Sequence, residues 1–568
     1  MAHHAGISNS CNVKNYNIHD RRISLQMSNK SNQILKQAGI LAIAGILCRI
    51  IGFIYRIPLT NIIGDRGNGY YGFAYIAYYN VLLITSYSIP GAISKVMAER
   101  LAINKYRNAQ KVFRCSLIYV LVVGGAASAI TFFTAPYFVS NETAAILRVF
   151  CPTIFFSGIL GVYRGYFQAH NTMVQSSISQ ILEQIVNAVA SIGMAAFFVN
   201  LVSESDETTI AVNGAIGSAI GTGAGVLTAL LFMLLVYRYN HSYIERKIQS
   251  DRTTNEESYG TIFKVITTKV TPIIISTFIY NLNTQISARV FKKVSTAINL
   301  YDKDKVTELY GVFSAKTVVL ISVPIAIATA LGATLLPNIA GTYALCGERE
   351  ASKKVNDSLK MLMIIVIPAT FGMFIFAGPI MKFMYPNPGE WELAASLLRI
   401  LSFDVIFISI STLSNAVLQA LGHPHKTVIN ASIALVLQTI ILVVLLVYTN
   451  MGIYALAVTT VLYAIIMCIL NRTTVLRYLS YRQSIMDTYV YPIIASLVMG
   501  AVSCGVYIIL YKIYPSNRID LMIAVAIAIV VYFATIIKLG GLSEEELRRL
   551  PKGHIIVSIA KKSRLIIN

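Results

Sequence analysis

The stretch 34–63, ILKQAGILAIAGILCRIIGFIYRIPLTNII, has the length of a membrane span but carries two arginines inside its apolar run. About 20 apolar residues suffice for a helix to cross a bilayer. Arg49 and Arg56 are nearly two helical turns apart, so both lie on one face, about 10 Å apart along the axis. An arginine at membrane depth is costly unless it faces a partner or a water-filled cavity. The stretch therefore predicts a membrane cavity that is lined by cations and receives an anion.

The composition is that of a polytopic membrane protein. Of 568 residues, 55% are hydrophobic and 13% are charged, with a mean hydropathy of +0.64, whereas an ordinary soluble protein carries about 25% charged residues. The net charge is +21, from 47 Lys and Arg against 26 Asp and Glu. In a soluble protein this excess would suggest nucleic acid. Here we attribute it to positive charge retained in cytoplasmic loops and expect no nucleic-acid partner.

Apolar runs separated by short breaks predict an all-α fold with about fourteen transmembrane helices. The predicted spans lie near residues 34–63, 72–98, 113–137, 144–168, 174–199, 210–237, 264–290, 309–335, 359–384, 395–419, 427–448, 452–476, 489–512 and 519–538. The longest predicted loops are 238–263 and 336–358, and neither is long enough for a soluble domain. Lys and Arg concentrate in alternate loops and in both tails. The positive-inside rule therefore predicts a multi-pass protein of the cell membrane with both termini cytoplasmic.

Two halves of the chain repeat one pattern. Arg148 begins an apolar run that ends at Gln168-Ala, and Arg399 begins one that ends at Gln419-Ala. This repeat predicts that helices 1–6 and 7–12 form two pseudo-symmetric six-helix lobes, to which two extra helices are added. Duplicated halves are typical of transporters. The predicted division is a cytoplasmic tail (1–33), an N-lobe (34–237), a cytoplasmic inter-lobe loop (238–263), a C-lobe (264–476), two extra helices (489–538) and a basic cytoplasmic tail (539–568).

Most charges within the predicted spans are cations. Arg49, Arg56 and Lys316, together with Lys95, are the candidates for binding an anion. Arginine matches phosphate oxygens in a bidentate manner, so the set favours a phosphate or diphosphate. A transporter of organic cations needs the reverse balance, with more carboxylates than cations.

A second group of polar residues is predicted to line or close the cavity. One stripe with helical spacing consists of Gln180, Glu183, Gln184 and Asn187. Glu183 would pair with a cavity cation or bind a proton or cation, although a structural hydrogen bond between helices also explains it. Asp404 is a further candidate for the polar cavity or for coupling. Arg164 and Glu99 lie near predicted cytoplasmic helix ends, where they would form a gate or rim or extend toward the membrane surface.

Motifs for catalysis and metal binding do not occur in the sequence. It contains no P-loop, H-E-x-x-H or G-x-S-x-G motif, and its cysteines form no CxxC pair. We therefore expect a transporter rather than an enzyme, with no metal and no cofactor. A membrane glycan polymerase or ligase and a non-transporting scaffold in a cell-wall complex are the alternatives from other classes.

Six motifs occur in an order that resembles one known family. They are Arg49-Ile-Ile-Gly-Phe, Gly64-Asp-Arg-Gly-Asn-Gly-Tyr70, Ile89-Pro-Gly-Ala-Ile-Ser-Lys95 with Glu99, Tyr163-Arg-Gly-Tyr-Phe-Gln168, Ser179-Gln-Ile-Leu-Glu-Gln184 and Ser543-Glu-Glu-Glu-Leu. Across nearly the whole chain they resemble the MurJ/SpoVB branch of the MOP exporter superfamily. This superfamily is MATE-like and includes lipid II flippases and flippases of polysaccharide biosynthesis.

The resemblance implies a cationic cavity between the lobes and a groove for a polyprenyl tail in the last two helices. It implies that Arg49, Arg56 and, approximately, Lys316 correspond to the cavity cations of the family. Some members bind sodium through carboxylates in helices 7 and 11. Here those helices offer only amides, so a sodium site of that design is not expected: Asn281, Asn283, Asn430 and Gln438.

The expected activity is alternating-access flipping of an undecaprenyl-diphosphate-linked cell-wall precursor, first of all lipid II, from the cytoplasmic to the outer leaflet. A monomer in contact with membrane lipids is expected. Flippases for teichoic acid, capsule or spore-cortex precursors and a MATE-like multidrug or cation antiporter are the alternatives. An inside-negative potential favours outward movement of anionic charge by about 2.3 kcal/mol per charge per 100 mV. Coupling to the membrane potential, to sodium or to protons stays open.

Overall fold

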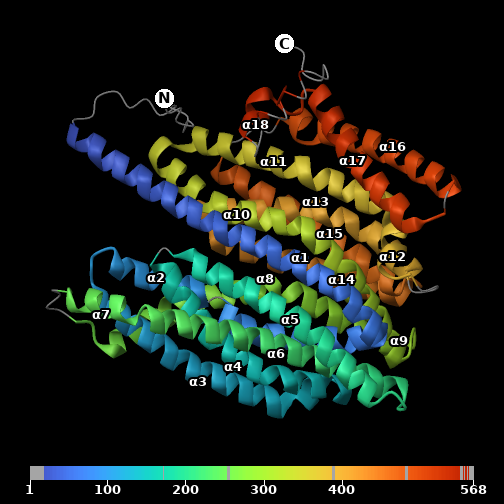
Figure 1. Ribbon diagram of the computed structural model, residues 1–568, viewed down its shortest axis with the longest axis horizontal. Helices are drawn as coiled ribbons and strands as arrows, with labels where there is room; N and C mark the ends of the chain where they lie inside the picture. The colour runs from blue at the N-terminus through green and yellow to red at the C-terminus, as the bar shows by residue number, and fades with distance from the viewer. Residues whose placement is uncertain are drawn as a thin grey trace.

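The computed structural model is a bundle of long helices (Figure 1). It describes residues 18–549 except 88, 171, 252–255, 387–390, 480–483 and 514, and in addition residues 554, 557, 558 and 561. No strand occurs among these residues, which confirms the all-α fold class. Twelve stretches of the described chain are long and apolar enough to cross a membrane.

The helices follow one another with short connections. The first part of the chain forms α1 (Ile18–Leu82), the π-helix η1 (Leu83–Tyr87), α2 (Ile89–Leu101), α3 (Tyr106–Phe138), α4 (Asn141–Ala169), α5 (Met173–Leu201), α6 (Glu207–Tyr239) and α7 (His241–Gln249). The second part forms α8 (Tyr259–Ala297), α9 (Lys303–Gly311), η2 (Val312–Val318), α10 (Val319–Cys346), α11 (Glu348–Ile375), α12 (Ala377–Met384), α13 (Glu392–Ala420), α14 (Pro424–Tyr448), α15 (Ile453–Tyr478), η3 (Met486–Val490), α16 (Tyr491–Ile513), α17 (Asn517–Lys538) and α18 (Glu544–Arg549).

The first two predicted spans are not separate helices, because α1 contains the first span and the beginning of the second, which continues into η1 and α2. Helix α1 bends at Gly64, whose φ of 66° and ψ of 177° are not helical. Glycine adopts a positive φ without the steric cost that a Cβ brings. The run Gly39–Leu101 covers most of the first predicted span and all of the second, and it counts once among the twelve. The predicted span 264–290 lies within α8, which is not among the twelve, so the count of fourteen stays a prediction.

Three predicted non-helical segments contain helix in the structure. The predicted loop 238–263 includes α7 (His241–Gln249) and the start of α8. Helix α1 begins at Ile18, inside the predicted tail 1–33, and residues 1–17 lie outside the described chain. The predicted loop 336–358 is wrong, because α10 ends at Cys346 and α11 begins at Glu348. A single residue with φ 80°, Gly347, separates them. Polar composition marks where a helix leaves the membrane, but it does not by itself end the helix.

The internal repeat predicted from sequence has a counterpart in helix lengths. Helices α4 and α13 each contain 29 residues. They end at Ala169 and Ala420, the alanines of the two predicted Gln-Ala pairs. Equal length at matching positions supports a duplication of the six-helix unit.

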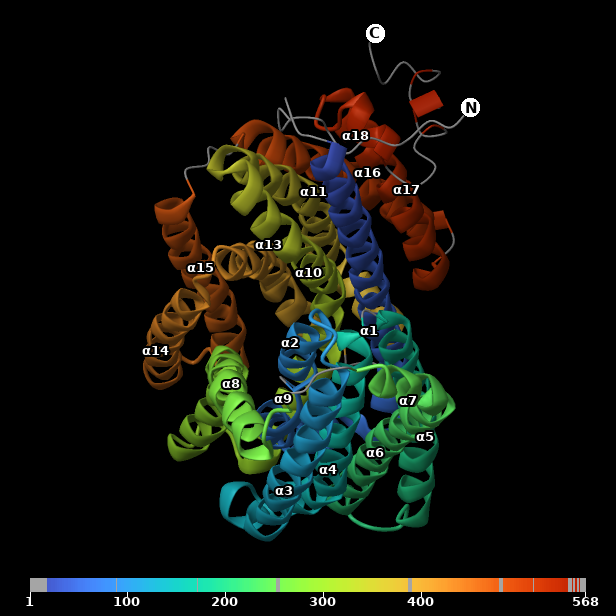
Figure 2. The same cartoon turned by 90° about the vertical axis from the view of Figure 1, so that its left-hand side faces the viewer.

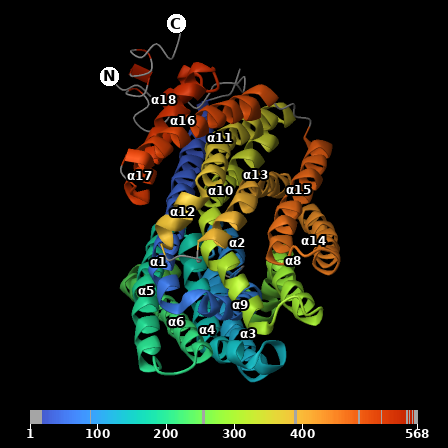
Figure 3. The ribbon, with the colours of Figure 1, turned by 90° about the vertical axis from the view of Figure 1, so that its right-hand side faces the viewer.

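In Figure 2 and, from the opposite side, in Figure 3, helices α2–α6 form one group and α10, α11 and α13 form another, while α8 and α9 lie beside the first group. We call α1–α6 the N-lobe and α8–α15 the C-lobe. Buried side chains such as Phe113 and Phe150 form the N-lobe cores, and Leu397 and Leu401 lie in the main C-lobe core. Helix α8 contributes to both, since Ile262 packs in an N-lobe core and Phe291 in the C-lobe core.

The last two long helices pack outside the C-lobe. Helices α16 and α17 contact each other, and α16 lies against α11 (Figure 3). The Tyr532 hydroxyl of α17 donates a hydrogen bond to the carbonyl of Ile364 at 2.6 Å. Lys360 of α11 lies 2.8 Å from Glu546 of α18 and so ties the C-terminal segment to the C-lobe. The predicted polyprenyl groove along α16 and α17 stays a prediction.

The two ends of the bundle differ in the segments that they carry. Helix α7 and the start of α1 lie at one end, and α9 lies at the other (Figure 1). The segment after α7 is held to the N-lobe, because Glu257 pairs with Arg100 at 2.6 Å and Glu256 pairs with Lys111 at 2.8 Å. The charge pattern predicts that the α7 end faces the cytoplasm, and this orientation stays a prediction.

Candidate functional site

A cavity of about 590 Å³ lies mainly within the N-lobe. Its walls come from α1, on both sides of the bend at Gly64, and from α4, α5 and α6. Val319 and Ser322 of α10 contribute from the C-lobe. Because α1 bends at Gly64, residues before and after the bend face the same cavity. The described lining contains four charged residues: Arg49, Arg56, Arg164 and Glu183.

Arg49 connects the two lobes across this cavity. Its Nη1 donates a hydrogen bond to the backbone carbonyl of Ser322 at 3.1 Å. The guanidinium is partly buried, as expected for an arginine that faces a cavity rather than lipid. A peptide carbonyl carries no net charge, so this hydrogen bond leaves the formal charge of Arg49 unchanged.

Arg56 lies in an aromatic part of the same wall. Its Cζ is 5.2 Å from the centre of the Tyr71 ring, a distance at which a cation and a π-system attract each other. Beyond the bend of α1, three further tyrosines line the cavity: Tyr75, Tyr78 and Tyr79. No prediction from the sequence included this aromatic wall. Its signal is the run Tyr70–Tyr79, YYGFAYIAYY, in which tyrosines recur at helical spacing.

The predicted polar stripe of α5 faces the cavity. The structure places all its members in the lining: Gln180, Glu183, Gln184 and Asn187. Spacing of three and four residues puts such side chains on one helix face, which is why the sequence indicated the stripe. Asn187 is also hydrogen-bonded within the N-lobe, because its Oδ1 accepts from Ser191 at 2.9 Å. What the stripe binds stays a prediction.

Glu183 is engaged by Arg164 from the neighbouring helix. The Arg164 Nη2 lies 2.7 Å from Glu183 Oε2, and the Arg164 Nε donates to Ser179 Oγ at 2.9 Å. Their side chains are 14% and 22% exposed, so the pair is partly screened from water. Among the predicted roles of Glu183, this geometry corresponds to pairing with a cavity cation. Arg164, predicted at a rim, lies in the lining itself.

Lys316 lies elsewhere. Its Nζ is 2.8 Å from both oxygens of Asp65, and its side chain is only 1% exposed. It also lies 4.8 Å from the centre of the Tyr385 ring. Lys316 is not in the described lining of the cavity, so the expected opposing wall is corrected to a buried ion pair between the lobes. Asp65 belongs to a predicted loop, and sequence offers no signal that it meets Lys316.

Three other predicted residues also lie outside the described cavity lining. Lys95 and Glu99 are exposed on α2. Asp404 is 6% exposed on α13, within the C-lobe. All three were candidates because each is a charged residue within an apolar run. The direction of each side chain, however, depends on how its helix is rotated in the bundle. Their expected roles in anion binding, at the rim or in coupling stay predictions.

The amides considered at sodium positions take part in hydrogen bonds within the C-lobe. Asn430 donates to Asn471 at 2.9 Å, and Gln438 donates to Ser287 at 3.0 Å. Asn283 accepts from Ser287 at 3.3 Å. In the part of the chain that the structure describes, no three His, Cys, Asp or Glu side chains are grouped so that they could hold a metal ion.

Comparisons with known proteins identify the family. Residues 109–519 match the family described as "Lipid II flippase MurJ". The chain is 24% identical over 547 residues to the lipid II flippase MurJ of Bacillus subtilis, covering 92% of this chain and 98% of that protein. It is 24% identical over 524 residues to stage V sporulation protein B of the same organism, covering 91% and 97%.

A solved structure shares the fold. The structure titled "Lipid II flippase MurJ, inward closed conformation" superimposes with a TM-score of 0.62 at 15% sequence identity. The match covers 87% of this chain and 97% of that one. At this identity the likeness concerns the fold alone.

Proposed function

The chain belongs to the MurJ lipid II flippase family, and from this premise we propose that it flips an undecaprenyl-diphosphate-linked cell-wall precursor, lipid II in the first place. Family membership confirms the resemblance that the sequence motifs indicated. The proposed movement runs from the cytoplasmic to the outer leaflet by alternating access. The diphosphate would bind in the N-lobe cavity while the polyprenyl tail stays in lipid.

The charge balance of the cavity is the observation that carries this proposal. Three arginines face one carboxylate in the described lining, and that carboxylate, Glu183, already pairs with Arg164. Three arginines and one glutamate give the described lining a formal charge of +2. Such a lining stabilises an anion, and arginine forks suit the oxygens of a diphosphate.

The remaining lining suits a sugar-bearing head group. The stripe of amides on α5 offers both hydrogen-bond donors and acceptors, as sugar hydroxyls require. The volume of about 590 Å³ lies within the range of about 300–1,000 Å³ that is common for ligand pockets. Arg49 would release the Ser322 carbonyl when it binds phosphate, so cargo binding would loosen one contact between the lobes.

A MATE-like cation antiporter is less well supported. A cation carrier needs a carboxylate that its cargo can reach, and the one in the described lining is held by Arg164 at 2.7 Å. The choice among lipid-linked glycans remains part of the proposal. Similarity to stage V sporulation protein B keeps a spore-cortex precursor as the second candidate cargo.

Replacing Arg49 tests the proposal. In cells depleted of their own lipid II flippases, Arg49→Ala is expected to lower lipid II translocation about 10- to 100-fold, since a charged hydrogen bond contributes about 1.5–3 kcal/mol. The matched control is Arg148→Ala on α4, whose arginine contacts Phe132 outside the cavity lining. The control is expected to translocate at the normal rate.

Two results would contradict the proposal. One is normal translocation by Arg49→Ala at normal amounts of protein in the membrane. The other is export of a cationic drug that depends on Glu183 and is indifferent to Arg49. If the protein restores only sporulation-specific glycan export, the proposed flippase activity stands and the proposed cargo changes from lipid II to a sporulation-specific precursor.

A further inference from the structure

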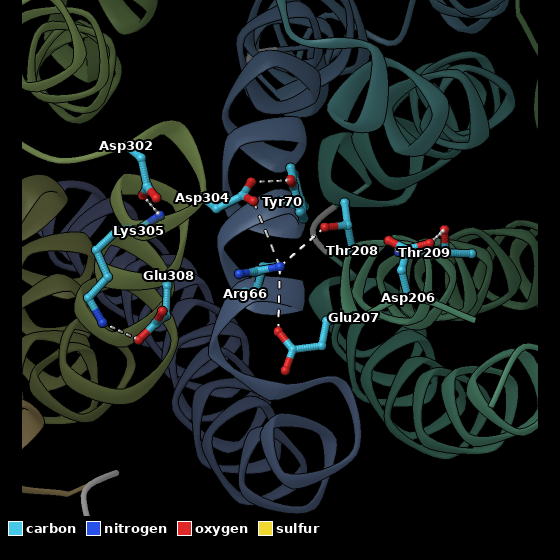
Figure 4. Close-up of polar contacts among 10 residues, drawn as sticks. All are labelled: Arg66, Tyr70, Asp206, Glu207, Thr208, Thr209, Asp302, Asp304, Lys305 and Glu308. Carbon is cyan, nitrogen blue, oxygen red and sulfur yellow. Dashed lines mark hydrogen bonds and ion pairs between the residues drawn. The ribbon is translucent and has the colours of Figure 1, made fainter. Parts of the chain in front are cut away.

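The two lobes meet closely at the α9 end. Figure 4 shows Arg66 of α1 between Glu207 of α6 and Asp304 of α9, at 3.6 and 3.9 Å. The Tyr70 hydroxyl donates to Asp304 at 3.3 Å. Glu207 and Asp304 are 86% and 48% exposed, so water screens these charges and the pairs contribute little. They mark the outer edge of the contact.

Below this edge, backbone packs directly on backbone. A Cβ placed on Gly69 of α1 would overlap the carbonyl oxygen of Thr307, and one placed on Gly311 would overlap the carbonyl oxygen of Asp65. Thr307 and Asp65 thus lie against glycines of the opposite lobe. Such close approach leaves no path between the lobes at this point, so this end is closed in the structure.

The buried pair Lys316–Asp65 adjoins this contact, because the carbonyl oxygen that lies against Gly311 belongs to Asp65. Asp65 belongs to the N-lobe and Lys316 to the C-lobe, and they are joined at 2.8 Å. If the lobes part here, Lys316 loses the carboxylate that compensates its charge. An uncompensated buried cation is strongly unfavourable, so opening requires another anion or water to take the place of Asp65.

The cavity and the buried pair are connected by α1. Arg56 and Asp65 both belong to this helix, and the partner of Asp65, Lys316, lies 4.8 Å from the centre of the Tyr385 ring. Arg56 lines the cavity and Lys316 does not. Asp65 follows Arg56 along α1 toward the α9 end, so an anion that moves from Arg56 in this direction approaches the Lys316–Asp65 pair.

We propose that Asp65 is an internal counter-anion that the diphosphate of the cargo replaces at Lys316, so that the lobes open at the α9 end only when cargo is bound. After release of the cargo, closure restores the Lys316–Asp65 pair. This inference rests on the proposed function, because it requires an anionic cargo. It assigns to Asp65 a positioning role that acts through Lys316.

The test measures opening at Thr307, which is 2% exposed against Gly69. Thr307→Cys is introduced into the full chain in lipid nanodiscs, where both membrane faces are accessible, and its reaction rate with a maleimide is measured. Undecaprenyl diphosphate is the probe, and inorganic diphosphate shows whether the lipid tail is needed. The chain without Thr307→Cys supplies the background from other cysteines.

With the native pair, undecaprenyl diphosphate is expected to raise the labelling rate at least fivefold. Asp65→Asn is expected to label fast with or without the probe, because the substitution removes the ion pair that joins the two lobes in the closed state. The double variant Asp65→Asn with Lys316→Gln is expected to label slowly in both conditions, since a neutral pair keeps the lobes closed but offers no cation. Asp65→Glu should behave like the native chain.

Asp304→Asn is the matched control, because it removes a carboxylate from the exposed edge of the same contact. It is expected to respond to the probe like the native chain. The inference is overturned if undecaprenyl diphosphate leaves native labelling unchanged, if Asp65→Asn still responds as the native chain does, or if Asp304→Asn labels as fast as Asp65→Asn. The Arg49→Ala translocation assay tests the proposed function separately, because Asp65 and Lys316 are unchanged in that variant.

Discussion

Gly69→Ala is expected to reduce translocation of the lipid-linked precursor at least tenfold without lowering the amount of folded protein. The added methyl group would overlap the Thr307 carbonyl oxygen, which belongs to the backbone of α9 and does not move like a flexible side chain. Overpacking of this kind costs about 1–3 kcal/mol. The cost falls on the closed arrangement at the α9 end, through which an alternating-access cycle must pass.

The local helix itself should tolerate the change. Alanine is a better helix former than glycine by about 1 kcal/mol, so α1 is not weakened by the substitution. The measurement is lipid II translocation in flippase-depleted cells, normalised to the amount of protein in the membrane. Maleimide labelling of Thr307→Cys in the same variant should rise, because the lobes spend more time apart.

Gly193→Ala is the matched control. Gly193 lies in α5, and a Cβ placed on it meets nothing within 4 Å. Its translocation rate is expected to stay within about twofold of the native rate, because substitutions away from packed contacts usually change stability by about 0.5 kcal/mol or less. Normal translocation by Gly69→Ala would show that the glycine contact is not part of the transport cycle.

Arg164→Ala and Glu183→Ala are expected to be coupled in a double-mutant cycle of unfolding free energies. Both side chains are less than a quarter exposed and meet at 2.7 Å. A charged hydrogen bond of this kind contributes about 1.5–3 kcal/mol, so the coupling free energy should be about 1–3 kcal/mol. Thermal unfolding in detergent of the native chain, both single variants and the double variant measures it.

Glu183→Gln separates a structural role from a cation-binding role. The amide keeps the shape of the side chain while the cavity becomes more positive by one charge. An anion-binding cavity should therefore hold undecaprenyl diphosphate at least as tightly as before, whereas a cation carrier should lose its cargo. Glu207→Ala is the control, since this carboxylate is 86% exposed. Fully additive effects of Arg164→Ala and Glu183→Ala would contradict the coupling.

Much of the candidate site could be read from helical periodicity. Arg49 and Arg56 share one face because they are seven residues apart, and both line the cavity. The stripe from Gln180 to Asn187 lies in the same lining for the same reason. Periodicity gives the directions of side chains on one helix relative to one another. These relative directions do not depend on how that helix packs against its neighbours.

Residues on different helices were harder to place. Lys95, Lys316 and Asp404 have the same signal as Arg49, a charge within an apolar run, yet none of them is in the described lining. Which way each points depends on the rotation of its helix against its neighbours. The partner of Lys316 is 251 positions away in sequence, in a segment between two predicted spans.

The sequence by itself determined the membrane class, the all-α fold, the family and the cationic face of helix α1. These follow from local quantities: hydropathy, residue spacing and the order of short motifs. Only the tertiary structure decided that Arg164 engages Glu183, that Asp65 buries against Lys316, and that glycines close the lobes at the α9 end. Each of these contacts joins separate helices, and its geometry is set by how the helices pack together rather than by the pattern along any one of them.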